Sequence, residues 1–509
     1  MKKSITYIAI LFSFSVSLAQ WTQLQPELLL KPMPVLLDSV HAGVNFYDFA
    51  GNIAGLFEDE HHFSLWAGSG IDYTDGGYRL PFEPTIRNDQ QYTVRLVKPL
   101  TERNIFKGYF GYHHNIDQSL LWIHQNRLSQ VNPFVLADSS RGTFVLDGLF
   151  WSGEWAHKFN RHWQSGIGVY YNVDHRLKQV FPKPEDRHRD VHFRAGIQNS
   201  YRKWRWGIAF RYFDEQEKVI ITKYNLQQNL TPVLYKFRYA DLPVVLLGKT
   251  SEERLINYHG ALVAGHFLAK IRNHLRALGN LRYITSSGKV EDGGSSPLPQ
   301  GTFDWQVWNA RAQFSLRKSQ KTEWVLRYDF RYESSKSQHP DFSITTGKRT
   351  NVTHAIMLGV KQKVKGKSFL FADATYQRSR EQEKDLMTEN FYDLGYHWAS
   401  VRLGISTRAS KWWSSSAWIN LQRYITFRER ISGNQYSEFF QALFLNRFSY
   451  LSNRSFGIGA GFQVTYHYGP MFDAVLTGQF LSQSGGKEWN GSKYLHNQFL
   501  NICLKFYII

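Results

Sequence analysis

The sequence predicts an all-β protein, namely a single antiparallel transmembrane β-barrel of about 14–18 strands, with sixteen as the expected even number, preceded by a cleavable signal peptide. Three observations support this fold. The N-terminus resembles an export signal, many segments have one apolar and one polar face at strand spacing, and an aromatic-rich composition is nonetheless hydrophilic on average.

The N-terminus has the three parts of a secretory signal peptide. Met1-Lys2-Lys3 is basic, an apolar run extends from Ile5 to Val16, and Ser17-Leu18-Ala19 offers small residues for cleavage. The alternative is a cytosolic protein whose first strand is apolar. The basic start, short apolar run and small-residue exit together favour an export signal, and the run is too short for a membrane-spanning helix.

This signal divides the chain into three predicted regions. We expect residues 1–19 to be removed, residues 20–39 to form an extended periplasmic segment that leads into the barrel, and residues 40–509 to form the barrel. A small plug is the alternative for residues 20–39, although that segment is short for filling a wide lumen.

Strand-like segments alternate between an apolar and a polar face. In the last one, Leu500, Ile502, Leu504, Phe506 and Ile508 share one face, while Asn501, Cys503, Lys505 and Tyr507 share the other. The alternation recurs at 204–212, 308–317 and 324–333, where bulky aromatic residues oppose charged ones. Half-buried strands of soluble proteins alternate too. Charge opposite large aromatic side chains favours lipid on one side and a wet lumen on the other.

The composition also favours a membrane barrel. The chain has 37 Phe, 28 Tyr and 16 Trp, yet its mean hydropathy is −0.41. No run of about 18 apolar residues follows the signal region, which excludes transmembrane helices. In a barrel, half of each strand faces water, which explains the low mean hydropathy. Aromatic residues gather at the two membrane interfaces, which explains their high number. The single cysteine, Cys503, excludes an intramolecular disulfide framework.

The formal net charge of +19 bears on the partners of the protein. A basic balance can indicate nucleic acid, but export argues against that partner. We expect outer-membrane lipid as the surroundings, an envelope protein as a further candidate partner, and anionic solutes or head groups as ligands. Excess charge on loops is the alternative.

Connection lengths give an independent test, because barrels join strands alternately by short periplasmic turns and longer outer loops. Short turns are expected near residues 160–161, 202–203, 319–320, 365–366 and 410–411. Long polar loops are expected at 176–190, 214–241, 286–301, 334–349, 378–396 and 429–436. The alternation becomes inconsistent at 452–454 and 469–470, which both look short, so the number of strands is predicted as a range.

Four segments carry a resemblance to a known family. They are Asn132–Arg141 (NPFVLADSSR) with Gly142 and a strand over 143–157, Phe181–Arg187 (FPKPEDR), Gly51–Leu56 (GNIAGL) and the Ala19-Gln20 junction. Together they resemble an uncharacterised family of Bacteroidota outer-membrane β-barrel proteins, over most of the mature chain. The sequence departs at Ser140-Arg141-Gly142, where two adjacent glycines are expected. The resemblance implies a barrel in the outer membrane of a Gram-negative bacterium, and it implies no established activity or functional residues.

Motifs for catalysis, cofactors and metals are absent from the sequence. It has no zinc-protease histidine pair, nucleophile elbow, phosphate loop or paired-cysteine spacing, so we expect no enzyme, no cofactor and no metal. The pairs His61-His62 and His113-His114 are predicted to be loop histidines, because adjacent residues of a strand point to opposite faces and cannot chelate one ion. A Ser–His or Asp–His pair assembled across strands would escape sequence analysis.

The predicted site is a set of inward-facing arginines. Its members are Arg205, Arg211, Arg276, Arg282, Arg311, Arg317, Arg327, Arg331 and Arg402. Rings of arginine can select anions in a pore. Polar barrel interiors are also commonly filled by charge ladders, and Asp329, Glu333 and Asp373 are candidate partners, so this alternative stays open.

Tryptophans at predicted strand ends are expected to form the interface girdles of the barrel. They are Trp151, Trp155, Trp412, Trp413 and Trp418. A sugar-stacking platform is the alternative. For function, the leading hypothesis is a non-enzymatic channel or transporter-like barrel for anionic or small polar solutes. An accessory or scaffold barrel beside another envelope complex is the second hypothesis, and an outer-membrane enzyme is the third.

Overall fold

The structure is a computed structural model of the 509-residue chain. The residues that it describes are 51–59, 63–76, 83–120, 132–138, 140–180, 183–222, 233–236, 244–247, 252–272, 274–294, 296–319, 321–340, 344–364, 366–387, 389–433, 445, 448–449, 452, 454–468, 472–487 and 494–508. The predicted signal peptide, the 20–39 segment and His61-His62 lie outside this part of the chain.

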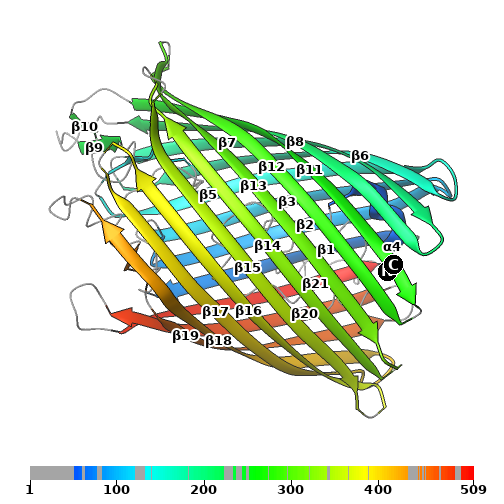
Figure 1. Cartoon of the computed structure of the whole chain (residues 1–509). Helices are drawn as coiled ribbons and strands as arrows, with labels where there is room; N and C mark the ends of the chain where they lie inside the picture. Colours follow the sequence, from blue (N-terminus) through cyan, green and yellow to red (C-terminus); the bar gives the residue numbers. More distant parts are fainter. Residues whose placement is uncertain are drawn as a thin grey trace, which may run out of the picture.

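In the described part of the chain, eighteen antiparallel strands form one closed barrel (Figure 1). The strands are β1 (Ser64–Gly76), β2 (Ile86–Thr101), β3 (Asn104–Leu120), β5 (Gly142–Lys158), β6 (Trp163–Lys178), β7 (Lys183–Tyr201), β8 (Trp204–Thr222), β11 (Glu252–Arg272), β12 (Leu275–Asp292), β13 (Leu298–Arg317), β14 (Thr322–Gln338), β15 (Thr345–Lys363), β16 (Ser368–Asp385), β17 (Phe391–Thr407), β18 (Trp413–Ser432), β19 (Ser455–Tyr468), β20 (Phe472–Lys487) and β21 (Tyr494–Ile508).

The barrel closes between its first and last strands. β1 pairs with β21 in a continuous register from Leu65 opposite Ile508 to Gly76 opposite Asn497. Asn501 Nδ2 donates a hydrogen bond of 2.6 Å to Asp72 Oδ1 across this seam. The all-β barrel prediction is confirmed, but the expected number of sixteen strands is wrong. The early strands have weak patterns, since large exposed apolar side chains are absent from the described positions of β1.

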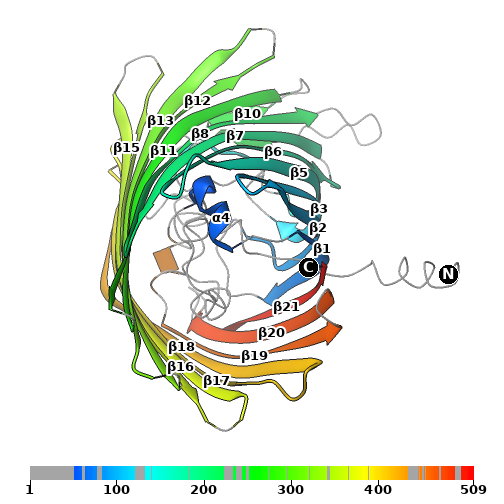
Figure 2. The same cartoon turned by 90° about the vertical axis from the view of Figure 1, so that its right-hand side faces the viewer.

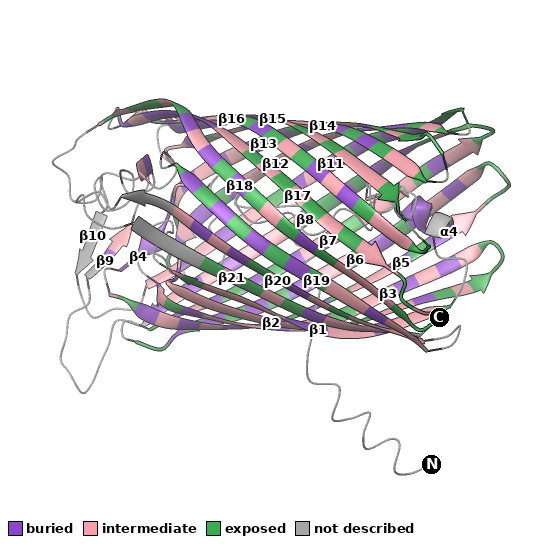
Figure 3. Ribbon diagram, turned by 90° about the horizontal axis from the view of Figure 1, so that it is seen from below, coloured by how far each residue is buried: buried purple, intermediate pink, exposed green. Residues whose placement is uncertain are grey.

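The outward faces of the strands carry an apolar belt. On β8, Trp204, Trp206, Ile208, Phe210 and Tyr212 are each at least 40% exposed, while the residues between them face inward. Buried and exposed residues alternate in this way along the wall (Figure 3). A span of nine residues is the length that a tilted strand needs to cross the apolar core of a bilayer. Of the helices in the described ranges, none has the length and apolar character to cross a membrane.

The strands continue well beyond this belt, which corrects several predicted loops. β6 ends at Lys178 and β7 begins at Lys183, inside the loop predicted at 176–190. The loops predicted at 214–241, 286–301, 334–349 and 378–396 likewise contain the ends of strands. Beyond the belt the outward face of the strands becomes largely polar, so no lipid-facing apolar pattern marks these residues as strand.

The inconsistency near the C-terminus is also resolved. β18 ends at Ser432 and β19 begins at Ser455, so residues 452–454 belong to one long connection. β19 ends at Tyr468 and β20 begins at Phe472, so the next connection is short, and β21 ends beside the start of β1. The five predicted short turns are confirmed, because each lies between two paired strands.

Two groups of residues lie apart from the barrel wall. The first is η4 (Ile53–Gly55) with α4 (Leu56–Asp59), inside the ring of strands (Figure 2). The second is a small sheet of β4 (Leu136–Ala137), β9 (Val233–Lys236) and β10 (Val244–Leu247), at the end of the barrel with the long connections (Figure 1).

Candidate functional site

The nine predicted arginines lie on the inner face of the wall, because each shares strand parity with buried residues. They come from β8 (Arg205, Arg211), β12 (Arg276, Arg282), β13 (Arg311, Arg317), β14 (Arg327, Arg331) and β17 (Arg402). The structure does not bring them into one group. Arg276 and Arg317 lie exposed near the short turns, and Arg402 lies several strands away from the others.

Several of these arginines have carboxylate partners, as the charge-ladder alternative expects. Arg311 Nε and Arg327 Nε each lie 2.5 Å from a different oxygen of Asp329. Arg331 lies 2.8 Å from Glu333, and Arg402 lies 2.8 Å from Asp373. The three predicted partner acids are thus confirmed as contacts.

A central arginine band crosses β7, β8 and β12–β14, formed by Arg194, Arg211, Arg282, Arg311 and Arg327. Arg194 stands directly opposite Arg211 in the register of β7 and β8, and Arg311 stands opposite Asp329. Two carboxylates bind within the band, since Glu154 lies 3.3 Å from Arg194 and Asp329 bridges Arg311 and Arg327. Like charges opposite each other across a sheet repel, so the band favours an anionic ligand.

Arg194 is not among the nine predicted arginines, although the sequence contains a signal for it. Phe193, Ala195 and Ile197 alternate with Arg194, Gly196 and Gln198 as in the other strands. The preceding residues were predicted to be a loop, and the strand that contains Arg194 was therefore not recognised. In the structure β7 begins at Lys183.

The segment before the barrel is fixed to the inner wall near the short turns. Asn52 Nδ2 lies 3.1 Å from Ile197 O on β7 and 3.1 Å from His266 Nε2 on β11. Its Oδ1 accepts a hydrogen bond from Ala54 N and so caps η4. Ile53 packs with Val97, Ile105 and Ala156. This segment contains the GNIAGL residues that carried the family resemblance.

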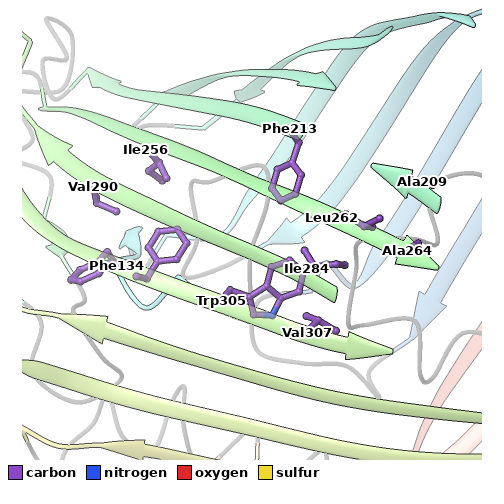
Figure 4. Close-up of a cluster of buried hydrophobic side chains, with 11 residues drawn as sticks. Phe134, Ala209, Phe213, Ile256, Leu262, Ala264, Ile284, Val290, Trp305 and Val307 are labelled. Atoms are coloured by element: carbon purple, nitrogen blue, oxygen red, sulfur yellow. The ribbon is translucent and has the colours of Figure 1, made fainter. Parts of the chain in front are cut away.

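The NPFVLAD residues, which carried part of the family resemblance, make specific contacts with the inner wall. Asn132 Oδ1 accepts a hydrogen bond from Phe134 N, and Phe134 enters an apolar cluster with Phe213, Phe303 and Trp305 on the wall (Figure 4). Arg254 Nη1 donates to Phe134 O at 3.1 Å. These residues therefore attach the long connection after β3 to the inner wall.

Charged pairs complete this outer end of the lumen, beyond the apolar belt. Lys178 Nζ lies 2.8 Å from Asp138 Oδ2, and both side chains are buried. Asp292 lies 2.7 Å from Arg254 and from Lys236. Burial raises the pKa of Asp292, but the hydrogen bond and charge of Arg254 and the charge of Lys236 outweigh this effect, and the pKa lies below its usual range.

A Ser–His–Asp arrangement lies on three adjacent strands near the short turns. Ser414 Oγ on β18 is 3.2 Å from His467 Nε2 on β19, and His467 Nδ1 is 2.8 Å from Asp473 Oδ1 on β20. An aspartate that accepts from Nδ1–H leaves Nε2 free to accept a proton from the serine. His467 and Asp473 are each about one quarter exposed.

The predictions for the histidine pair and for the tryptophans hold only in part. His113 faces inward and is buried, while His114 faces outward, so the pair does point to opposite faces. Both belong to β3, and the prediction that they are loop histidines is wrong. Trp151, Trp155, Trp412 and Trp413 are exposed, but Trp418 faces inward and is buried against Gly461. Trp418 is therefore not a girdle residue.

Comparisons with known proteins give one family and a set of distant folds. Residues 54–508 match a family of unknown function (DUF6850). No curated protein matches the chain. Similar solved structures include the ferric yersiniabactin uptake receptor FyuA from Yersinia pestis (10% identity, 88% of this chain and 80% of that chain, TM-score 0.48). Another is the copper transporter OprC (9% identity, 87% of this chain and 80% of that chain, TM-score 0.46). A third is the CymD monoaromatic hydrocarbon channel (10% identity, 91% of this chain and 93% of that chain, TM-score 0.33). At these TM-scores the likenesses carry no argument about function.

Proposed function

The chain belongs to this family of unknown function (DUF6850), and from that premise we propose that it is a non-enzymatic outer-membrane barrel of the channel or transporter type. Its location is the outer membrane of a Gram-negative bacterium, of the phylum Bacteroidota by the sequence resemblance. The apolar belt supports this location, because exposed Trp, Ile, Leu and Phe side chains surround a wall whose inner face is polar.

The solutes are anionic or small polar molecules, and the central arginine band supports this class. It projects five guanidinium groups from five strands toward the lumen, with Glu154 and Asp329 as bound carboxylates. The side chain of Arg311 is about one third exposed, so solvent reaches the band. Guanidinium groups bind carboxylate and phosphate oxygens through two parallel hydrogen bonds.

Ion selectivity in planar bilayers tests the role of the band. Under a salt gradient, the wild-type barrel should pass anions in preference to cations, and the Arg282→Gln/Arg311→Gln variant should shift the reversal potential toward equal permeability. Arg317→Gln is the matched control, since Arg317 lies on the same face of β13 but exposed near the short turns. It should leave the selectivity unchanged. An inserted, folded barrel that does not conduct contradicts the proposal.

A non-conducting barrel would favour the accessory or scaffold function. The residues inside both ends of the lumen support this alternative, namely the Asn52 segment at one end and the Phe134 cluster at the other. Purification with a stoichiometric envelope protein would then be the expected result.

A second candidate function is hydrolysis of an acyl ester, because Ser414, His467 and Asp473 have the contacts of a nucleophile, a base and an orienting acid. A fluorophosphonate probe should label Ser414 in the folded wild-type protein, and His467→Gln should abolish labelling. Ser416→Ala, two residues along the same strand, is the control and should be labelled normally. Absence of an adduct on Ser414 rejects this function.

A further inference from the structure

A layer of buried histidines and carboxylates lies between the central arginine band and the outer end of the lumen. Asp186, His188, Asp190 and His192 are alternate residues of β7 and are each at most 3% exposed. Strand geometry directs all four to the inner face. The neighbouring strands add Asp174 on β6 and Glu215 on β8.

Three side chains of this layer converge on one point. Ligand atoms of Asp190, His192 and Glu215 all lie within 4.8 Å of one another. Ligands of a tetrahedral Zn²⁺ ion are about 3.4 Å apart, as follows from metal–ligand distances of about 2.1 Å. Rotation of the side chains can bring the ligand atoms from this separation to the spacing that the ion requires. We propose that Asp190, His192 and Glu215 bind a divalent transition-metal ion in the lumen.

His192 is placed as a metal ligand beside Asp190. Its Nε2 lies 2.8 Å from Asp190 Oδ1, yet neither ring nitrogen has hydrogen-bond geometry to any partner among the described residues. The side chain is 3% exposed. Buried ring nitrogens normally form hydrogen bonds or bind metals. An ion between His192 and Asp190 satisfies both groups.

Charge is the second, independent observation. Asp190 stands directly opposite Glu215 in the register of β7 and β8. Two carboxylates opposite each other repel, and a cation between them removes this repulsion. Arg211 attracts Asp190 from the side of the arginine band. A divalent cation bound by both carboxylates neutralises them and holds the two strands together.

The surrounding residues form an orienting shell. Asp174 Oδ2 lies 3.2 Å from His188 Nδ1, and His188 Nε2 faces Glu215 Oε2 at 3.6 Å. Asp174 Oδ1 also contacts His113 Nε2 at 3.1 Å. A Cβ at Gly148 would lie 2.3 Å from His113 Nε2, so glycine is what lets His113 reach across β5. Carboxylate–histidine contacts of this kind orient ligands at metal sites.

The ligand set defines the class of metal. Imidazole together with carboxylates suits Zn²⁺ and neighbouring divalent transition ions, whereas Ca²⁺ and Mg²⁺ prefer oxygen ligands alone. The sequence signal was the alternation of Asp and His over 186–192. It was overlooked because most of these residues were predicted to be a loop, and the expectation of no metal followed from motifs alone.

Metal binding can be measured on the full barrel in detergent after removal of metals with EDTA. The wild-type protein should retain one Zn²⁺ per chain after dialysis, measured by plasma mass spectrometry. His192→Gln and Glu215→Gln should each lower the affinity at least tenfold. His175→Gln is the matched control, because His175 lies on the outer face of β6, exposed, 3.1 Å from Glu185.

Folding of each variant is checked by its heat-dependent mobility in gels. Co²⁺ gives a further measurement on the wild type alone, where a strong visible absorption indicates nitrogen and oxygen ligands in a tetrahedral site. Absence of stoichiometric Zn²⁺, a weak octahedral Co²⁺ spectrum, or unchanged Zn²⁺ affinity in folded His192→Gln each overturns the proposal. The proposal does not depend on conductance, because binding is measured without a bilayer.

Discussion

Glycines on the inner wall determine where the segment before the barrel binds. A Cβ at Gly196 would lie 2.0 Å from Asn52 Oδ1, and a Cβ at Gly166 would lie 2.5 Å from Ile53 Cγ2 and 2.9 Å from its backbone carbon. Such distances are shorter than any van der Waals contact. Asn52 and Ile53 can therefore reach the wall because it has no side chains at these positions.

Substitution of Gly166 tests this packing. Alanine in place of glycine ordinarily stabilises a strand, but Gly166→Ala must displace the backbone of Ile53, so we expect the free energy of unfolding to fall by about 1–3 kcal/mol. Gly265→Ala is the control, because a Cβ there has no atom within 4 Å. Denaturant titration of the refolded barrel measures both. Equal stability of the two variants would contradict the close contact.

The sequence predicts on which side of the barrel wall a residue lies, but it predicts only some of the contacts that the residue makes. Alternation alone placed Arg311 and Arg327 on the lumen side, and the acids of the same strands suggested Asp329 as their partner. Ser414, His467 and Asp473 come from three different strands. Their meeting depends on the register between strands, which a single sequence does not reveal.

The strands are longer than a membrane crossing requires. They contain 13 to 21 residues, whereas about nine to eleven cross the apolar core of a bilayer. Hydropathy recognises only the part that faces lipid. Beyond this part, hydrogen bonding between strands continues while the outward residues become largely polar, and this is why the predicted loops were too long.

The limits of the belt can be tested on one strand. Leu281 and Ser287 lie on the same outward face of β12, six residues apart, and Leu281 is 52% exposed within the belt. In lipid vesicles, Leu281→Arg should lower the free energy of unfolding by about 2–4 kcal/mol, and Ser287→Arg by about 0–1 kcal/mol. Similar costs at both positions would show that the belt is misplaced.

At the scale of the whole molecule, the number of strands was hard to predict because some strands have weak sequence patterns. β1 has Gly and Ser at several positions, and its strand character becomes evident only from its pairing with β21. The contents of the lumen were equally beyond prediction. Asn52 and His266 are 214 residues apart, and Phe134 reaches the wall through the long connection after β3.

The lumen is layered along its axis. From the short turns outward, β7 and β8 present the Asn52 contact, the arginine pair Arg194 and Arg211, and the histidine–carboxylate layer, and β8 ends among apolar residues around Leu136. A solute that moved through the barrel would meet groups of different chemistry in a fixed order.

Because paired strands rather than loose connections form the wall above the belt, the width of the opening is determined by how many strands the barrel contains. The residues between Gln338 and Thr345 lie outside these paired strands. Substitutions there leave the number of paired strands, and with it the width of the barrel, unchanged.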